Sequence, residues 1–155
     1  MVKKILLGLA ALLLAIQFIR PAKNVSQGLS TNDISVVYSD IPQEIHVILQ
    51  KKCYDCHSNN TTYPWYSNLQ PVAWWLDSHI EEGKEHLNFS EFATYEKKKA
   101  DHKLEELVEE VAEGEMPLKS YTLIHREAVV TPEELTLIRT WVSSMGIKVE
   151  KEGGE

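Results

Sequence analysis

Apolar residues recur at helical spacing through most of this chain. The clearest case runs from about Tyr95 to Glu113, where the apolar positions fit an i, i+3, i+4, i+7, i+8 series. These positions are Leu104, Leu107, Val108, Val111 and Ala112. Gly114 follows directly and is a natural helix stop. The pattern predicts a long amphipathic helix that buries one face.

Three further stretches show the same period. One starts at Asp40, with Pro42 in its first turn, a second starts at Pro71, and a third starts at the capping box Thr131–Glu134. Their apolar stripes are Ile41, Ile45, Ile48 and Leu49; Val72, Trp75, Leu76, His79 and Ile80; and Leu135, Ile138, Trp141, Val142 and Met145. No stretch is typical of a strand, so the sequence predicts an all-α fold.

The N-terminus has a different pattern. Lys3 and Lys4 precede an apolar run, Ile5 to Ile19, that is broken only by Gln17 and shows no polar face. As a helix this run spans about 22 Å, less than the roughly 30 Å of a bilayer core. It is typical of a bacterial export signal, and because no small-x-small cleavage site follows, we favour an uncleaved signal anchor with the lysines in the cytoplasm. A buried N-terminal helix is the alternative.

Composition and periodicity predict how the 155 residues are divided into segments. A hydrophobic content of 43% allows one domain with a real core. We expect residues 1–20 to be the export signal or anchor, 21–39 a linker without clear period, 40–147 the helical domain, and 148–155 a charged tail.

Charge excludes one class of partner. Three of the 16 basic residues lie within the first 20 positions, so the remainder holds 13 basic against 23 acidic residues, or roughly −10. Such a surface repels nucleic acid, and we expect no nucleic-acid partner. No Gly-rich phosphate loop or catalytic constellation appears either.

The two cysteines carry the strongest chemical signal. Cys53 and Cys56 stand three positions apart, and His57 follows the second. This C-x-x-C-H arrangement is typical of a c-type haem attachment site, where each thiol forms a thioether and the imidazole is an axial ligand. A redox-active dithiol would not need the histidine, and a structural zinc site would need a second ligand pair. Covalent haem is favoured over both alternatives.

Two residues compete for the second axial position. Met116 follows the helix stop at Gly114, and Pro117 favours an extended conformation for it, so its thioether can leave a loop rather than a helix face. His79 lies on an apolar stripe and is more often a core or rim histidine. Met116 is the favoured sixth ligand and His79 the alternative.

The order of these parts resembles the class I, mono-haem cytochrome c fold, and more closely the bacterial haem-binding domain family. The resemblance covers about residues 30–147. It rests on the motif Cys53–His57 followed by Ser58-Asn59, on Tyr63-Pro64-Trp65, on Gly114-Glu115-Met116-Pro117 and on Trp141. It implies a cytochrome c-like helical domain around one covalent haem c, with thioethers at Cys53 and Cys56, proximal His57 and distal Met116.

Filled axial positions favour electron transfer over catalysis. If His57 and Met116 both bind the iron, substrate cannot reach it, so we expect a non-enzymatic, outer-sphere electron carrier. The alternative is a haem-based sensor or peroxidase-like enzyme with an open or weakly held sixth position. The expected partners are a redox protein with a basic patch and, through the N-terminal segment, the membrane. The expected location is the periplasmic side of the inner membrane, either anchored or released after signal cleavage.

Overall fold

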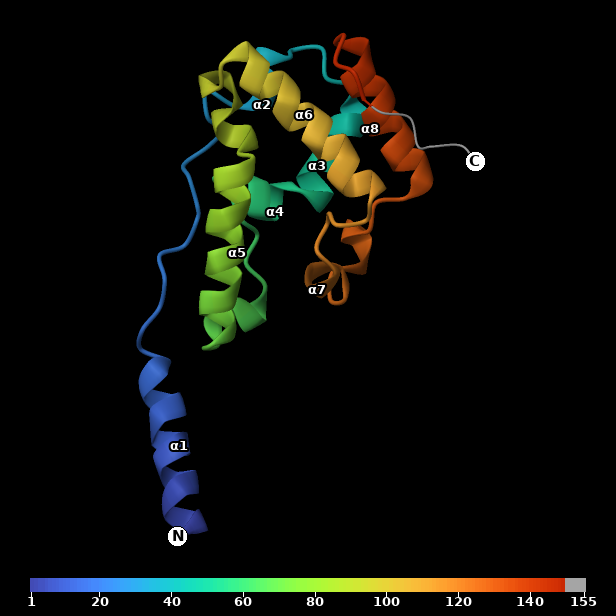
Figure 1. Ribbon diagram of the computed structural model, residues 1–155. Helices are drawn as coiled ribbons and strands as arrows, with labels where there is room; N and C mark the ends of the chain where they lie inside the picture. Colours follow the sequence, from blue (N-terminus) through green and yellow to red (C-terminus); the bar gives the residue numbers. More distant parts are fainter. Residues whose placement is uncertain (150–155) are drawn as a thin grey trace.

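The computed structural model describes residues 1–149, and within this range the regular elements are helices joined by loops (Figure 1). The one β contact there is an isolated antiparallel bridge between Val25 and Asn60. The predicted all-α class is therefore confirmed. The elements are α1 Val2–Ile16, α2 Ile34–Val37, α3 Gln43–Lys52, α4 Tyr54–His57, η1 Trp65–Asn68, α5 Val72–His86, η2 Phe89–Thr94, α6 Lys97–Ala112, α7 Lys119–Thr122, η3 Arg126–Ala128 and α8 Pro132–Ser144.

The core lies where α3, α6 and α8 meet. The stripe of α6 faces α8, and α3 packs against both α4 and α8. Fully buried side chains at this junction include Leu49, Leu104, Ile138 and Val142. The stripes predicted for these three helices thus supply a large part of the core, and Phe89 and Phe92 of η2 complete it together with Ile34 of α2.

Local capping explains where α8 begins and where α6 ends. Thr131 accepts a hydrogen bond from the Glu134 main-chain N–H, and the Glu134 carboxylate accepts one from the Thr131 N–H, which completes the predicted capping box. Gly114 has φ +74° directly after α6. This left-handed conformation favours glycine and stops the helix as predicted.

Two details of the predicted helices are wrong. The first domain helix begins at Gln43 rather than Asp40, because Pro42, with extended backbone, takes the N-cap position. On α5, Val72 and Trp75 are exposed, whereas Ala73 and Gly83 join Leu76 and Ile80 on the buried face. At Gly83 this face lies directly against the Cys56 backbone of α4.

Helix α1 stands apart from the domain. It has no buried residue, and it extends away beyond the N-terminal end of α5 (Figure 1). Within residues 1–149, no helix combines the length and apolarity needed to cross a bilayer.

Residues 21–39, expected as a linker, are in close contact with the domain. Ile34 in α2 is completely buried, and Ala93 N donates to the Asn32 carbonyl at 2.9 Å. Asn24 Nδ2 donates to the Ser58 carbonyl at 2.8 Å. The segment therefore contributes to the core and meets the chain just beyond the C-x-x-C-H motif. Most of the tail predicted from residue 148 lies outside the described residues.

Candidate functional site

One tight turn presents the two thiols and the imidazole together. Helix α3 ends at Lys52, and Cys53 is both its C-cap and the N-cap of α4. The Cys53 carbonyl accepts from the main-chain N–H groups of Cys56, at 3.2 Å, and of His57, at 2.9 Å. These bonds wind the motif into a single helical turn, so its three chemical groups share one short element.

A main-chain hydrogen bond orients the His57 ring. Nδ1 lies 2.9 Å from the Leu87 carbonyl oxygen, and because a carbonyl only accepts, Nδ1 carries the proton. Nε2 of the neutral ring therefore keeps its lone pair. Burial lowers the pKa of His57, although hydrogen bonding of its ring to the backbone of Leu87 and Gly83 opposes this. A neutral ring with a fixed tautomer is the arrangement that metal-binding histidines show.

Burial also keeps the two thiols protonated. It raises the pKa of Cys53 to about 12, with a further contribution from the neighbouring Cys56. It raises the pKa of Cys56 to about 11, and the Asp55 carboxylate adds to the effect. Both cysteines are free in the structure. Burial outweighs the lowering effect of Lys52 on the pKa of Cys53, so neither thiol has the lowered pKa of an activated redox dithiol, which disfavours that alternative.

Gly83 lets α5 approach the motif closely. A Cβ at this position would lie 2.8 Å from the Cys56 carbonyl oxygen. Any side chain there would force α4 and α5 apart. The glycine thus fixes the distance between the attachment turn and the helix that carries His79.

Met116 belongs to a loop that is fixed at its start. The main-chain N–H groups of Glu115 and Met116 both donate to the Glu110 carbonyl at 3.0 Å, just before the C-terminal end of α6. Met116 is partly buried, and Pro117 follows it into α7. The loop leaves α6 in a defined direction.

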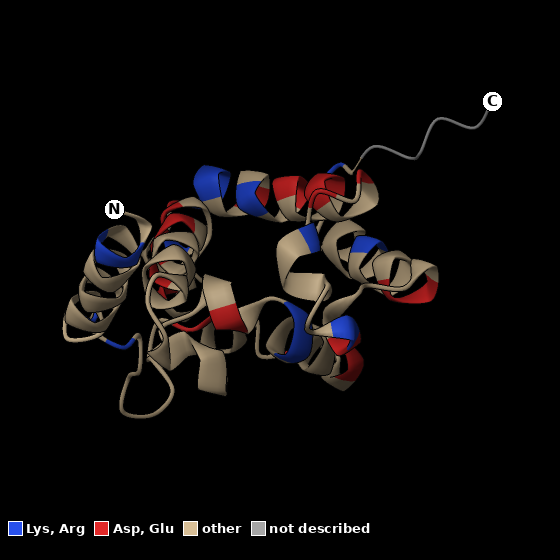
Figure 2. Cartoon of the chain, turned by 90° about the horizontal axis from the view of Figure 1, so that it is seen from below, with Lys and Arg blue, Asp and Glu red and all other residues tan. Residues whose placement is uncertain are grey.

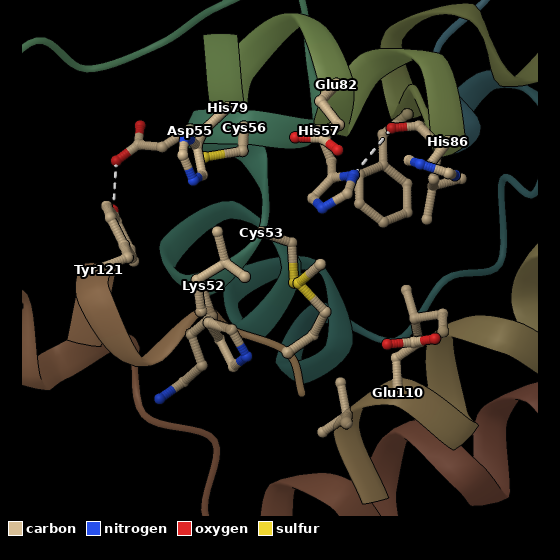
Figure 3. A pocket seen from close by; sticks show the side chains of 18 of the residues that line it. Lys52, Cys53, Asp55, Cys56, His57, His79, Glu82, His86, Glu110 and Tyr121 are labelled. Carbon is tan, nitrogen blue, oxygen red and sulfur yellow. Dashed lines mark hydrogen bonds between the residues drawn. The ribbon is translucent and has the colours of Figure 1, made fainter. Parts of the chain in front are cut away.

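All four predicted site residues line a single cavity of about 470 Å³, a volume typical of small-molecule and cofactor pockets. Figure 3 shows Cys53, Cys56 and His57 arranged around it. Part of its wall is apolar, built by Leu87, Phe89, Leu107, Val111, Pro117 and Leu118. The structure thus brings the C-x-x-C-H turn and the Met116 loop, 59 positions after His57, to one pocket.

His79 lines the same cavity. Its Nδ1 lies 2.8 Å from the Trp75 carbonyl oxygen, and the centroids of the His79 and Trp75 rings are 4.3 Å apart. The competition between His79 and Met116 therefore persists in the structure, since both border the pocket.

Several lining residues were not predicted from the sequence. These polar residues are Lys52, Asp55, Glu82, His86, Lys103, Glu106, Glu110 and Tyr121. Most lie on α5 and α6, where the pattern of charged residues predicts only a solvent-exposed helix face. One signal was present for Asp55 alone, because it lies inside the C-x-x-C-H motif.

The side chains of Asp55 and Lys52 bind this stretch of the chain to its C-terminal part. Tyr121 in α7 donates from its hydroxyl to the Asp55 carboxylate at 2.7 Å (Figure 3). Lys52, next to Cys53, donates to the carbonyls of Glu127 and Val129 and pairs with Glu134 at 3.1 Å. The chain that follows Met116 is thus held near the attachment turn.

The fold and the pocket together define an all-helical protein with a cofactor-sized cavity bordered by a C-x-x-C-H turn. A family model, described as a haem-binding domain, matches residues 11–144. The chain belongs to this haem-binding domain family and is a haem protein. No curated protein and no solved structure matches the chain significantly.

Proposed function

We propose that this protein carries a single covalent haem c and acts as an outer-sphere electron carrier on the periplasmic side of the bacterial inner membrane. The observation that carries the proposal is the convergence of Cys53, Cys56, His57 and Met116 on one cavity. Two thiols, an imidazole with a free lone pair and a thioether form the donor set of a c-type haem site.

The pocket fits this group in its chemistry. Apolar side chains such as Leu107 and Val111 suit the faces of a macrocycle, while polar residues also border the cavity. Cys53 and Cys56 would hold the haem covalently, and His57 would bind the iron through Nε2. When bound, a haem whose iron is held by histidine and methionine supplies one-electron redox chemistry at a raised potential.

The chain would hold the iron ligands in place before the haem binds. The Leu87 carbonyl holds His57 in one tautomer, so the ligand needs no rearrangement. The Glu110 carbonyl and the Tyr121–Asp55 bond hold the Met116 loop near the pocket. If His57 and Met116 held the iron together, substrates would be kept from it, and electron transfer would need only contact with a partner.

Charge indicates the kind of partner. The chain after residue 20 carries an excess of acidic residues, which favours a redox protein with a basic patch. The apolar N-terminal helix with Lys3 and Lys4 at its start supports attachment to the inner membrane with the domain outside.

The sixth ligand decides between a carrier and its rival, so its substitution is the test. In Met116→Ala holoprotein we expect the ferric methionine–iron charge-transfer band to disappear and the ferrous form to bind carbon monoxide. His79→Ala should retain the band and exclude carbon monoxide. It is a matched control, because both residues line the cavity and both variants remove a candidate ligand.

The second candidate function is a haem-based sensor or peroxidase-like enzyme. It is favoured by the titratable side chains of His79 and His86, which border the same pocket. If the parent already binds carbon monoxide rapidly and Met116→Ala changes neither its spectrum nor its potential, the carrier proposal fails and this function replaces it.

A further inference from the structure

Exposed apolar side chains gather around the N-terminal end of α5. We name this group the aromatic corner. Its members are Trp65, Leu69, Val72, Trp74 and Trp75. Trp65 is the most exposed of the five, at 77%. Clusters of large apolar side chains are costly to leave in water, so such a surface commonly contacts something outside the chain.

The corner is also free of charge. Residues 58–76 contain no Asp, Glu, Lys or Arg, although charged residues make up 25% of the chain. Charged side chains are instead spread along helices such as α6 (Figure 2). Moving a carboxylate out of water is expensive, whereas this surface can leave water without that cost.

Hydrogen bonds join the corner to the end of α1. The Gln17 side chain donates to the Gln70 carbonyl at 3.2 Å and accepts from the Gln70 N–H at 3.0 Å. The Ile19 carbonyl accepts from the Gln70 side chain at 2.7 Å and from Trp74 Nε1 at 3.0 Å. The point at which the chain leaves α1 is therefore fixed against the corner.

The length of α1 indicates that residues next to it lie close to the membrane. The 15 residues of α1 span about 22 Å, less than the roughly 30 Å of hydrocarbon in a bilayer. A short apolar helix draws its flanking residues towards the membrane, and Phe18 and Ile19 beyond it are exposed and apolar too. Tryptophan prefers the headgroup layer, where its ring is partly desolvated and its N–H still finds a partner.

We infer that the aromatic corner lies in the headgroup layer of the membrane that holds α1, and so seats the haem domain directly on the lipid surface. This inference rests on the proposed membrane attachment. It makes the corner a second, interfacial contact rather than leaving the domain suspended on a free tether.

Lipid-borne quenchers test the inference on the full-length holoprotein. It is reconstituted in phosphatidylcholine and phosphatidylglycerol vesicles, either plain or with acyl chains brominated near the headgroup. The matched variant Trp65→Phe/Trp74→Phe/Trp75→Phe keeps only Trp141, which is 7% exposed in the core. Bromination should reduce the tryptophan emission of the parent and leave that of the triple variant unchanged. Comparing each holoprotein in the two lipids cancels quenching by the haem itself.

Alkaline carbonate washing separates the two possible failures. If the parent stays with the vesicles but bromination does not reduce its emission, the anchor stands and the inference about the corner is wrong. If the parent washes off, the proposed attachment is wrong and the inference falls with it. If the corner emission shifts to the blue only after native membrane proteins are added, the corner binds a protein and the inference is overturned.

Discussion

Gly83 is the residue that sets how closely α5 meets the attachment turn. A single glycine inside a helix ordinarily destabilises it, by about 1 kcal/mol of helix free energy relative to alanine. Here its missing side chain leaves room for the Cys56 carbonyl, which a Cβ would approach to 2.8 Å. The sequence could not predict this role, because the opposing atom comes from 27 positions earlier in the chain.

Gly83→Ala should therefore destabilise the protein despite its better helix propensity. We expect a loss of about 1–3 kcal/mol in unfolding free energy, typical of overpacking, because backbone rather than a flexible side chain opposes the new methyl group. Denaturant unfolding measures it. Gly8→Ala in α1 is the control, since nothing lies within 4 Å of its added Cβ. A Gly83→Ala variant as stable as the parent would contradict the close approach of α5.

Other single residues could be predicted because their signal is local. The C-x-x-C-H turn, the helix stop at Gly114 and the capping box at Thr131 each depend on neighbours within a few positions. The Leu87 carbonyl that orients His57 could not be predicted, since a main-chain acceptor 30 positions away leaves no mark in the sequence.

At the scale of elements, α2 shows that the domain begins before residue 40. Ile34→Ala should cost about 2–5 kcal/mol, because this completely buried side chain packs in the core. Val36→Ala in the same helix is the matched control, since Val36 is 54% exposed and should cost little. Thermal or denaturant unfolding distinguishes them. Equal stability of the two variants would return residues 21–39 to the status of a linker.

Helix α7 holds the Met116 loop to the motif through one side-chain bond. Tyr121→Phe removes the hydroxyl that donates to Asp55 and should cost about 1 kcal/mol. We also expect faster carbon monoxide binding to the ferrous protein, because the loop loses its contact with the attachment turn. Thr122→Val is the control, since its hydroxyl bonds only to the carbonyls of Leu118 and Lys119 nearby. Identical binding rates in parent and Tyr121→Phe would show that the bond does not restrain the loop.

Elements were predicted well where one apolar face meets the core and poorly where two backbones approach. The stripes of α6 and α8 follow their burial closely. On α5 the largest apolar residues, including Trp75, are exposed, and on the buried face the Cys56 backbone leaves no room for a side chain at Gly83. Periodicity reports which residues are apolar, and it cannot report how close the neighbouring element will be.

Across the whole molecule, three properties are arranged along one chain. An apolar helix with two lysines lies at the N-terminus, an uncharged aromatic corner follows at its exit, and the acidic helical domain holds the pocket. Membrane attachment, lipid contact and acceptance of a basic partner would then be properties of separate surfaces.

Covalent attachment of the haem is the central claim, and denaturation tests it most directly. The parent is matured in a bacterial host that exports proteins and attaches haem, alongside Cys53→Ala and Cys56→Ala. Haem staining of denaturing gels, the pyridine haemochrome spectrum and intact mass are measured on each. The parent should keep one haem through denaturation, and each variant should yield little holoprotein with at most one thioether, because the chain has no third cysteine. Loss of haem from the denatured parent, or haem staining of both variants as strong as that of the parent, would contradict the account.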